Sequence, residues 1–75
     1  MGHNYAKPLT VAQKMEHLLD RIPPSWTVVV ERRAGEATWR ALVHAPGQDG
    51  AWSDPAPDPA AALEDTWRRN RTVTV

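Results

Sequence analysis

The side chains that could bind a charged partner are carboxylates gathered in one stretch of this sequence. The whole chain has nine acids, nine lysines and arginines and no formal net charge, yet residues 41–67 contain no lysine or arginine. The acids of this stretch are Asp49, Asp54, Asp58, Glu64 and Asp65. A segment of one charge sign attracts a surface of the opposite sign. We therefore predict that residues 49–65, called here the acidic segment, contact a basic protein surface. Trp52 would serve there either as an aromatic anchor or as part of the core.

Most of these acids also have a local structural explanation. Asp58 is a favourable helix N-cap and Asp49 suits a turn. Glu64 and Asp65 lie early in a predicted helix, where negative charge is favourable. Alternating prolines stiffen residues 54–59, so acids there lose less entropy on binding. The acidic segment is interpreted either as a partner surface or as a solvated surface, and Asp54 is the acid without a local role.

The arginines form two groups that offer an alternative function, which is nucleic-acid binding. One group surrounds a predicted hairpin and the other ends the last predicted helix: Arg32, Arg33 and Arg40, and Arg68, Arg69 and Arg71. Basic patches bind the phosphate backbone of nucleic acids. The neutral overall charge disfavours this alternative relative to the acidic segment.

No motif typical of catalysis or metal binding is present. His3, His17 and His44 lack the spacing of metal ligands, and the chain has no cysteine to complete such a site. Ser25 and Ser53 lie outside a nucleophile-elbow pattern, and no glycine pattern cradles a phosphate. We therefore expect a protein that is not an enzyme and that uses no metal and no cofactor.

A first helix is predicted to begin after Thr10. Thr10 and Gln13 have the spacing of a capping box, and Pro23 and Pro24 end the pattern. The apolar residues in between follow the period of one helix face. They are Val11, Met15, Leu18, Leu19 and Ile22.

A second helix is predicted to begin at Asp58, with Pro59 in its first turn. Its buried face would carry Ala60, Leu63 and Trp67, with Asn70 as a candidate C-cap.

Residues 26–33 and 38–45 are rich in β-branched residues and are predicted to form an antiparallel hairpin around Ala34 and Gly35. Pairing Arg33 with Glu36 separates the two faces of the sheet, and a loop two residues longer keeps the same faces. One face is then apolar: Trp26, Val28, Val30, Trp39, Ala41 and Val43. The other is mostly polar: Thr27, Val29, Glu31, Arg40, Leu42 and His44.

Residues 51–53 are predicted to add a short third strand. The expected fold class is α+β, a single α-β-β-β-α domain over residues 1–75 with a three-stranded antiparallel sheet and two helices packed on one face. Residues 1–9 and 72–75 are expected to be loose. A sheet with two open edges also allows a homodimer, so we expect a monomer or a weak homodimer.

The predicted element order resembles that of the double-stranded-RNA-binding domain. That family contacts its duplex through its first helix, the loop between its first two strands and a lysine-rich start of its second helix. Here the corresponding start, Asp58-Pro59-Ala60-Ala61-Ala62, has no lysine. The resemblance therefore implies nucleic-acid binding only through the arginines.

The small size, the absence of cysteine, the charge layout and the Asp58-to-Leu63 helix start resemble small accessory proteins of phages and mobile elements. Anti-CRISPR proteins are a prominent group among these. Several of them act as DNA mimics by presenting acidic surfaces to the DNA-binding channel of a CRISPR effector. The resemblance implies an inhibitor of a CRISPR effector subunit. It assigns no site residues, because that class shares no motif.

The remaining composition bears on location. No apolar run approaches the roughly 20 residues that cross a bilayer, and the first ten residues lack the apolar region of a signal peptide. We therefore expect a cytoplasmic protein without membrane contact.

Overall fold

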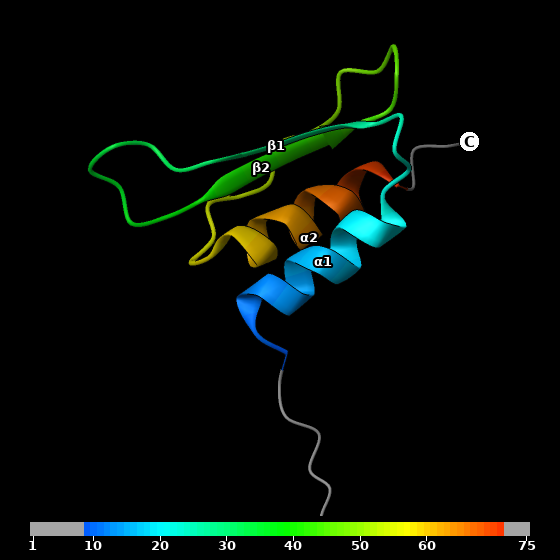
Figure 1. The fold of residues 1–75 in the computed structure, drawn as a ribbon. Coiled ribbons are helices and arrows are strands. Elements are labelled where there is room, and N and C mark those ends of the chain that lie inside the picture. Colours follow the sequence, from blue (N-terminus) through cyan, green and yellow to red (C-terminus); the bar gives the residue numbers. More distant parts are fainter. Residues whose placement is uncertain (1–8, 72–75) are drawn as a thin grey trace, which may run out of the picture.

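The computed structural model describes residues 9–71. In chain order it contains α1 (Val11–Arg21), β1 (Thr27–Glu31), β2 (Arg40–His44) and α2 (Pro59–Asn70). The two strands form a two-stranded antiparallel sheet. The sheet lies on α2, and α1 packs on α2 rather than on the strands (Figure 1). The expectation of a three-stranded sheet with both helices on one face is therefore wrong, although the α+β class is confirmed.

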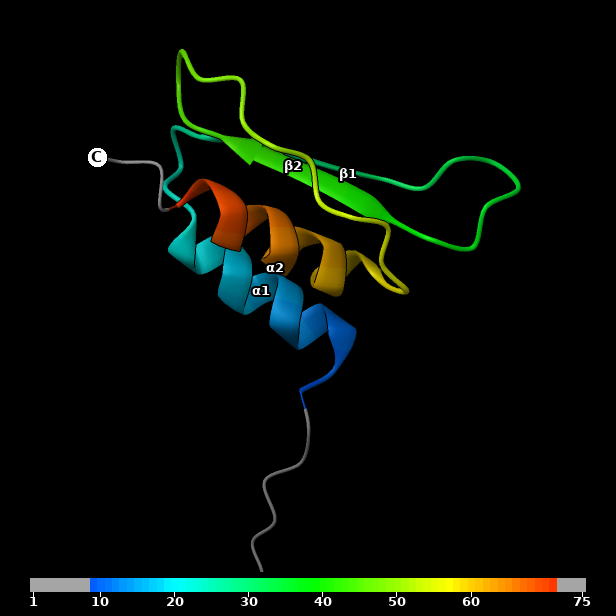
Figure 2. The same cartoon turned by 180° about the vertical axis from the view of Figure 1, so that it is seen from behind.

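The third strand predicted at residues 51–53 does not form. The chain runs along β2 on the side away from β1 (Figure 2), but its β-bridge, between Trp39 and Ala56, is isolated. The Ser53 N–H donates to the Ala41 carbonyl at 2.9 Å. Between these two contacts the chain advances three residues, from Ser53 to Ala56, while the facing chain advances only two, from Trp39 to Ala41. A continuous ladder needs equal numbers. After Ser53 the next N–H directed at the facing chain would come from residue 55, but Pro55 has none. The Asp54 N–H points the other way and donates to the Asp65 carboxylate at 2.9 Å.

The hairpin confirms the predicted division into two faces. Val30 pairs with Ala41 and Val28 with Val43. This is the register expected for a loop two residues longer than the one that pairs Arg33 with Glu36. Ala41 and Val43 are fully buried, whereas Val28 on the edge strand keeps 36% of its surface exposed.

The first helix matches its prediction. The Thr10 hydroxyl accepts from the Gln13 N–H at 3.1 Å, and the Gln13 side-chain oxygen accepts from the Thr10 N–H at 3.0 Å. The helix ends before its C-cap, Ile22. Within the apolar stripe Leu18 and Ile22 are buried, but Leu19 is 47% exposed, because α1 packs on one helix and not on the sheet.

The second helix lies between the sheet and α1, so it is buried on two sides. Asp58 caps its N-terminus as predicted. Ala60 and Leu63 are buried, and Trp67 meets Trp26 edge-on with ring centroids 5.5 Å apart. A second buried side was not predicted, because two of its members are polar: Ala62, Thr66 and Asn70. Asn70 is not the C-cap, which is Arg71.

The predicted loose ends, residues 1–9 and 72–75, fall outside the described residues except for Leu9, which is exposed.

Candidate functional site

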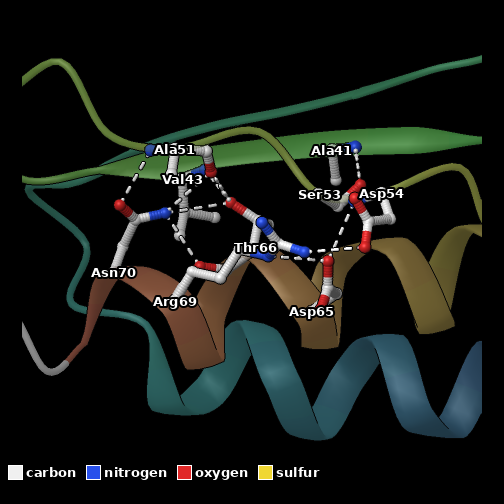
Figure 3. A network of polar contacts seen from close by, with 9 residues as sticks. All are labelled: Ala41, Val43, Ala51, Ser53, Asp54, Asp65, Thr66, Arg69 and Asn70. Carbon is white, nitrogen blue, oxygen red and sulfur yellow. Dashed lines mark hydrogen bonds and ion pairs between the residues drawn. The ribbon is translucent and has the colours of Figure 1, made fainter.

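Polar side chains cover the edge of β2 that a third strand would have covered. The Ala41 N–H donates to Ser53 Oγ at 2.9 Å, and the Val43 N–H donates to Thr66 Oγ1 at 3.1 Å (Figure 3). Buried N–H groups need acceptors, and here two hydroxyls take the place of strand carbonyls. Ser53 and Thr66 are themselves buried, so the edge of β2 is closed to solvent at these positions.

The same network holds the chain at Ala51. Thr66 Oγ1 donates to the Ala51 carbonyl at 2.8 Å. The Asn70 side chain accepts from the Ala51 N–H at 2.9 Å and donates to the Ala51 carbonyl at 3.0 Å (Figure 3). Both neighbours of Trp52, Ala51 and Ser53, are thus fixed by hydrogen bonds to α2 and β2. The network therefore positions the backbone that carries Trp52.

Trp52 itself lies outside the core, with 38% of its surface exposed. The Arg40 guanidinium stacks on its ring at 4.4 Å from the centroid, and Arg40 also pairs with Glu31 at 3.3 Å. Arg40 and Leu42 alternate with the buried Ala41 and Val43, so they lie on the sheet face away from α2. Val29 lies opposite Leu42 and therefore shares this face. We call Val29, Arg40, Leu42 and Trp52 the Trp52 face.

Of the predicted acids, the structure brings Asp54 and Asp65 together around a single arginine. Arg69 Nη2 lies 2.8 Å from Asp54 Oδ2, and Arg69 Nε lies 3.0 Å from Asp65 Oδ2 (Figure 3). Asp54 therefore has a local role, contrary to the sequence interpretation. Its compensating base comes from α2, four residues beyond Asp65.

The other predicted acids do not join this cluster. Asp58 accepts from the Ala61 N–H at 2.8 Å as the N-cap. Asp49 and Glu64 are exposed and form no ion pair with the described residues. Glu64 also points about 100° away from Asp65 around the helix axis. The five acids thus do not make one continuous face.

The two arginine groups lie apart. The loop between β1 and β2, with Arg32 and Arg33, lies at the end of the sheet near the start of α2 (Figure 1). Arg68, Arg69 and Arg71 lie at the opposite end, where α2 finishes. Arg40 and Arg69 already have acidic partners. The predicted nucleic-acid residues therefore do not form a single basic surface.

The remaining candidate residues have ordinary surroundings. His17 is exposed, and Nδ1 of the half-buried His44 lies 3.2 Å from the Ala45 carbonyl. His3 falls outside the described residues. Over residues 9–71 no group of three histidines or acids has the geometry to hold a metal ion. Neither described helix has the length and apolar character that crossing a membrane requires.

Sequence reasoning missed the Trp52 face as a unit. The alternation of the two strands already placed Val29, Arg40 and Leu42 together, but on a face interpreted as mostly polar. Their link to Trp52 depends on the path of residues 51–56, which has no strand periodicity.

Comparison of the chain with protein-family models, curated proteins and solved structures found no match.

Proposed function

We propose that this protein is a non-enzymatic inhibitor or adaptor that binds a basic protein surface, with Trp52 as the anchor. The observation that supports the proposal is that Trp52 is 38% exposed, whereas Trp26, Trp39 and Trp67 pack against the core. Tryptophan and arginine are the residue types that most often dominate binding energy in interfaces.

The surroundings of Trp52 favour a preorganised anchor. Its backbone neighbours are hydrogen-bonded to buried groups, and Arg40 restrains its ring from one side. A side chain that is already ordered loses less conformational entropy when it is buried by a partner. Val29 and Leu42 extend the apolar area around it.

The charge of the acidic segment favours a basic partner. Its five acids combined with Arg69, the base that contacts two of them, give a net charge of −4 (−5 + 1). Asp49 and Glu64 have no ion pair with the described residues, so their charges remain available to attract a basic surface. The DNA-binding site of a CRISPR effector is the partner class that the resemblance implies.

Parallel capture from a host lysate tests the proposal. Wild type is compared with Trp52→Ala, with the double variant Asp49→Lys/Glu64→Lys, and with Leu19→Ala. Leu19 is the matched control, because it is an exposed apolar residue on α1. We expect Leu19→Ala to retain the partner, Trp52→Ala to lose it, and the charge variant to weaken it most at low salt. A partner retained equally by all variants would refute the proposal.

Asp49 and Glu64 are the informative acids for this experiment. Replacing Asp54 or Asp65 would also break their contacts with Arg69, and a loss of binding would then have two causes.

A second candidate function is single-strand nucleic-acid binding at the hairpin. Arg32 stacks on Trp39 at 5.4 Å from the ring centroid, and Arg32 and Arg33 form no ion pair with the described residues. Arginines beside an aromatic ring bind single strands through charge and stacking. Against this, Glu31 and Glu36 line the shallow pocket beside Trp39. A gel shift at low salt decides the matter: no shift with single strands or duplexes excludes it, and a shift lost in Arg32→Ala/Arg33→Ala supports it.

A further inference from the structure

The outer edge of β1 is the open edge of the described sheet. The N–H groups of Ala41 and Val43 on β2, and of Trp39 just before it, all point away from β1. They reach acceptors in α2 or in the segment between β2 and α2. In an antiparallel pair of strands, the backbone N–H and C=O groups of two opposite residues either point towards each other or both point away from each other. Val30 and Val28, which lie opposite Ala41 and Val43, therefore present their N–H and C=O groups outward. No third strand pairs with β1 among the described residues.

This edge lacks the features that normally block edge-to-edge pairing. Thr27–Glu31 reads TVVVE and contains no proline, glycine or lysine. Its register with β2 is continuous, without a bulge. Val28 and Val29 are each 36% exposed. Protein edges are usually protected by charged residues, prolines or bulges, so an unprotected run of valines is a surface suited to strand addition.

We propose that β1 pairs with β1 of a second copy of this chain, antiparallel about a twofold axis at Val29. Two two-stranded sheets then join edge to edge into one sheet of four strands. Val28 lies opposite the partner's Val30. The backbone groups of both residues point away from their own β2, so the two residues of each such pair form two backbone hydrogen bonds with each other. The two Val29 side chains meet at the axis, on the side of the Trp52 face.

The sequence of β1 is suited to its own copy. The three valines read the same from either side of Val29, as a twofold interface requires. Glu31 falls opposite the partner's Thr27, so no like charges are opposed. A register with Glu31 opposite its own copy would oppose two carboxylates.

The size of the interface sets the strength of association. A five-residue strand buries less than the roughly 1,600 Å² of a standard stable interface. The dimer is therefore weak, with association at micromolar concentrations or above. A lone two-stranded sheet is only marginally stable, and a wider sheet is more stable.

Hydrogen exchange and sedimentation over a concentration series test the proposal on the wild-type chain. We expect the mean mass to rise from 8.4 kDa towards twice that value. The amides of Val28 and Val30 should gain protection with concentration, while that of Val29, which points to β2, stays unchanged. A constant mass, or equal changes at all three amides, would overturn the proposal.

A charge exchange at Val29 tests the register. Val29→Lys and Val29→Glu each oppose two like charges across the axis, so each variant alone should dimerise at least about tenfold more weakly. An equimolar mixture should associate again, because the opposed charges are then opposite. Leu42→Lys is the matched control, because it places a charge on the same face one strand further from the axis. Circular dichroism checks that each variant is folded. A monomeric mixture, or a loss of dimer in Leu42→Lys as large as in Val29→Lys, would overturn the proposed register.

Discussion

The substitution Thr66→Val should destabilise the fold although it nearly preserves the shape of the side chain. Thr66 is fully buried, and its hydroxyl accepts from the Val43 N–H at 3.1 Å and donates to the Ala51 carbonyl at 2.8 Å. Valine leaves the buried Val43 N–H without an acceptor. The Ala51 carbonyl still receives the Asn70 side chain at 3.0 Å.

The magnitude follows from these contacts. An unpaired buried N–H costs about 1–3 kcal/mol, and the lost hydroxyl donor adds about 1 kcal/mol. The expected loss is thus about 2–4 kcal/mol. A chain of 75 residues has a total stability of roughly 4–11 kcal/mol, so the variant loses a large share of it.

Urea unfolding followed by tryptophan fluorescence measures this loss. Thr66→Ser keeps the hydroxyl and loses one methyl, so it should cost only about 1 kcal/mol. Thr38→Val changes an exposed threonine and should stay within about 0.5 kcal/mol of wild type. A Thr66→Val variant as stable as Thr38→Val would refute the inference that this hydroxyl closes the edge of β2.

Three further predictions concern stability and are checked by the same unfolding assay. Gly50→Ala should cost at least about 1 kcal/mol more than Gly47→Ala. Both glycines have positive φ, but a Cβ at Gly50 would lie 2.8 Å from the Val43 carbonyl oxygen, whereas Gly47 has open space; equal losses would contradict this. Asp58→Ala should cost about 1 kcal/mol through loss of the N-cap. The Asp54 side chain is 78% exposed, so Asp54→Ala should cost no more than about 1 kcal/mol, and less at high salt. A salt-independent loss of stability in Asp54→Ala would be inconsistent with a surface ion pair. Trp52→Ala should stay within about 1 kcal/mol of wild type, because Trp52 does not belong to the core cluster and its stack with Arg40 is a partly exposed cation–π contact. Leu63→Ala in the core should cost about 2–5 kcal/mol, and a comparable loss in Trp52→Ala would place Trp52 in the core.

The elements that the sequence predicted well are those governed by local interactions. The capping box of Thr10 and Gln13 and the Asp58 N-cap before Pro59 involve residues at most three apart, and both form as expected. The division of the hairpin into two faces follows from strand alternation alone, so it held although the pairing moved by two residues.

The elements that were not predicted depend on contacts between distant residues. The path of residues 51–56 is held by contacts with α2, such as the hydrogen bond from the Asp54 N–H to Asp65. Thr66 is buried against the edge of β2, where it accepts from the Val43 N–H, and Asn70 is buried against Ala51. Neither contact has a periodic signal in the sequence.

The candidate site shows the same division. The N-cap explanation of Asp58 was available from the sequence, whereas the pairing of Asp54 with Arg69 was not, because they are far apart in the chain and come from different elements. The exposure of Trp52 likewise follows from two fixed neighbours, Ala51 and Ser53, whose partners lie on α2 and β2.

The most direct test of partner binding through the Trp52 face is a calorimetric titration of the captured partner with wild type and with Trp52→Ala. Loss of a central tryptophan anchor costs at least about 2 kcal/mol, so we expect the dissociation constant to rise by at least about thirtyfold while the unfolding midpoint stays close to that of wild type. Equal dissociation constants for the two proteins would contradict the assignment of Trp52 as the anchor.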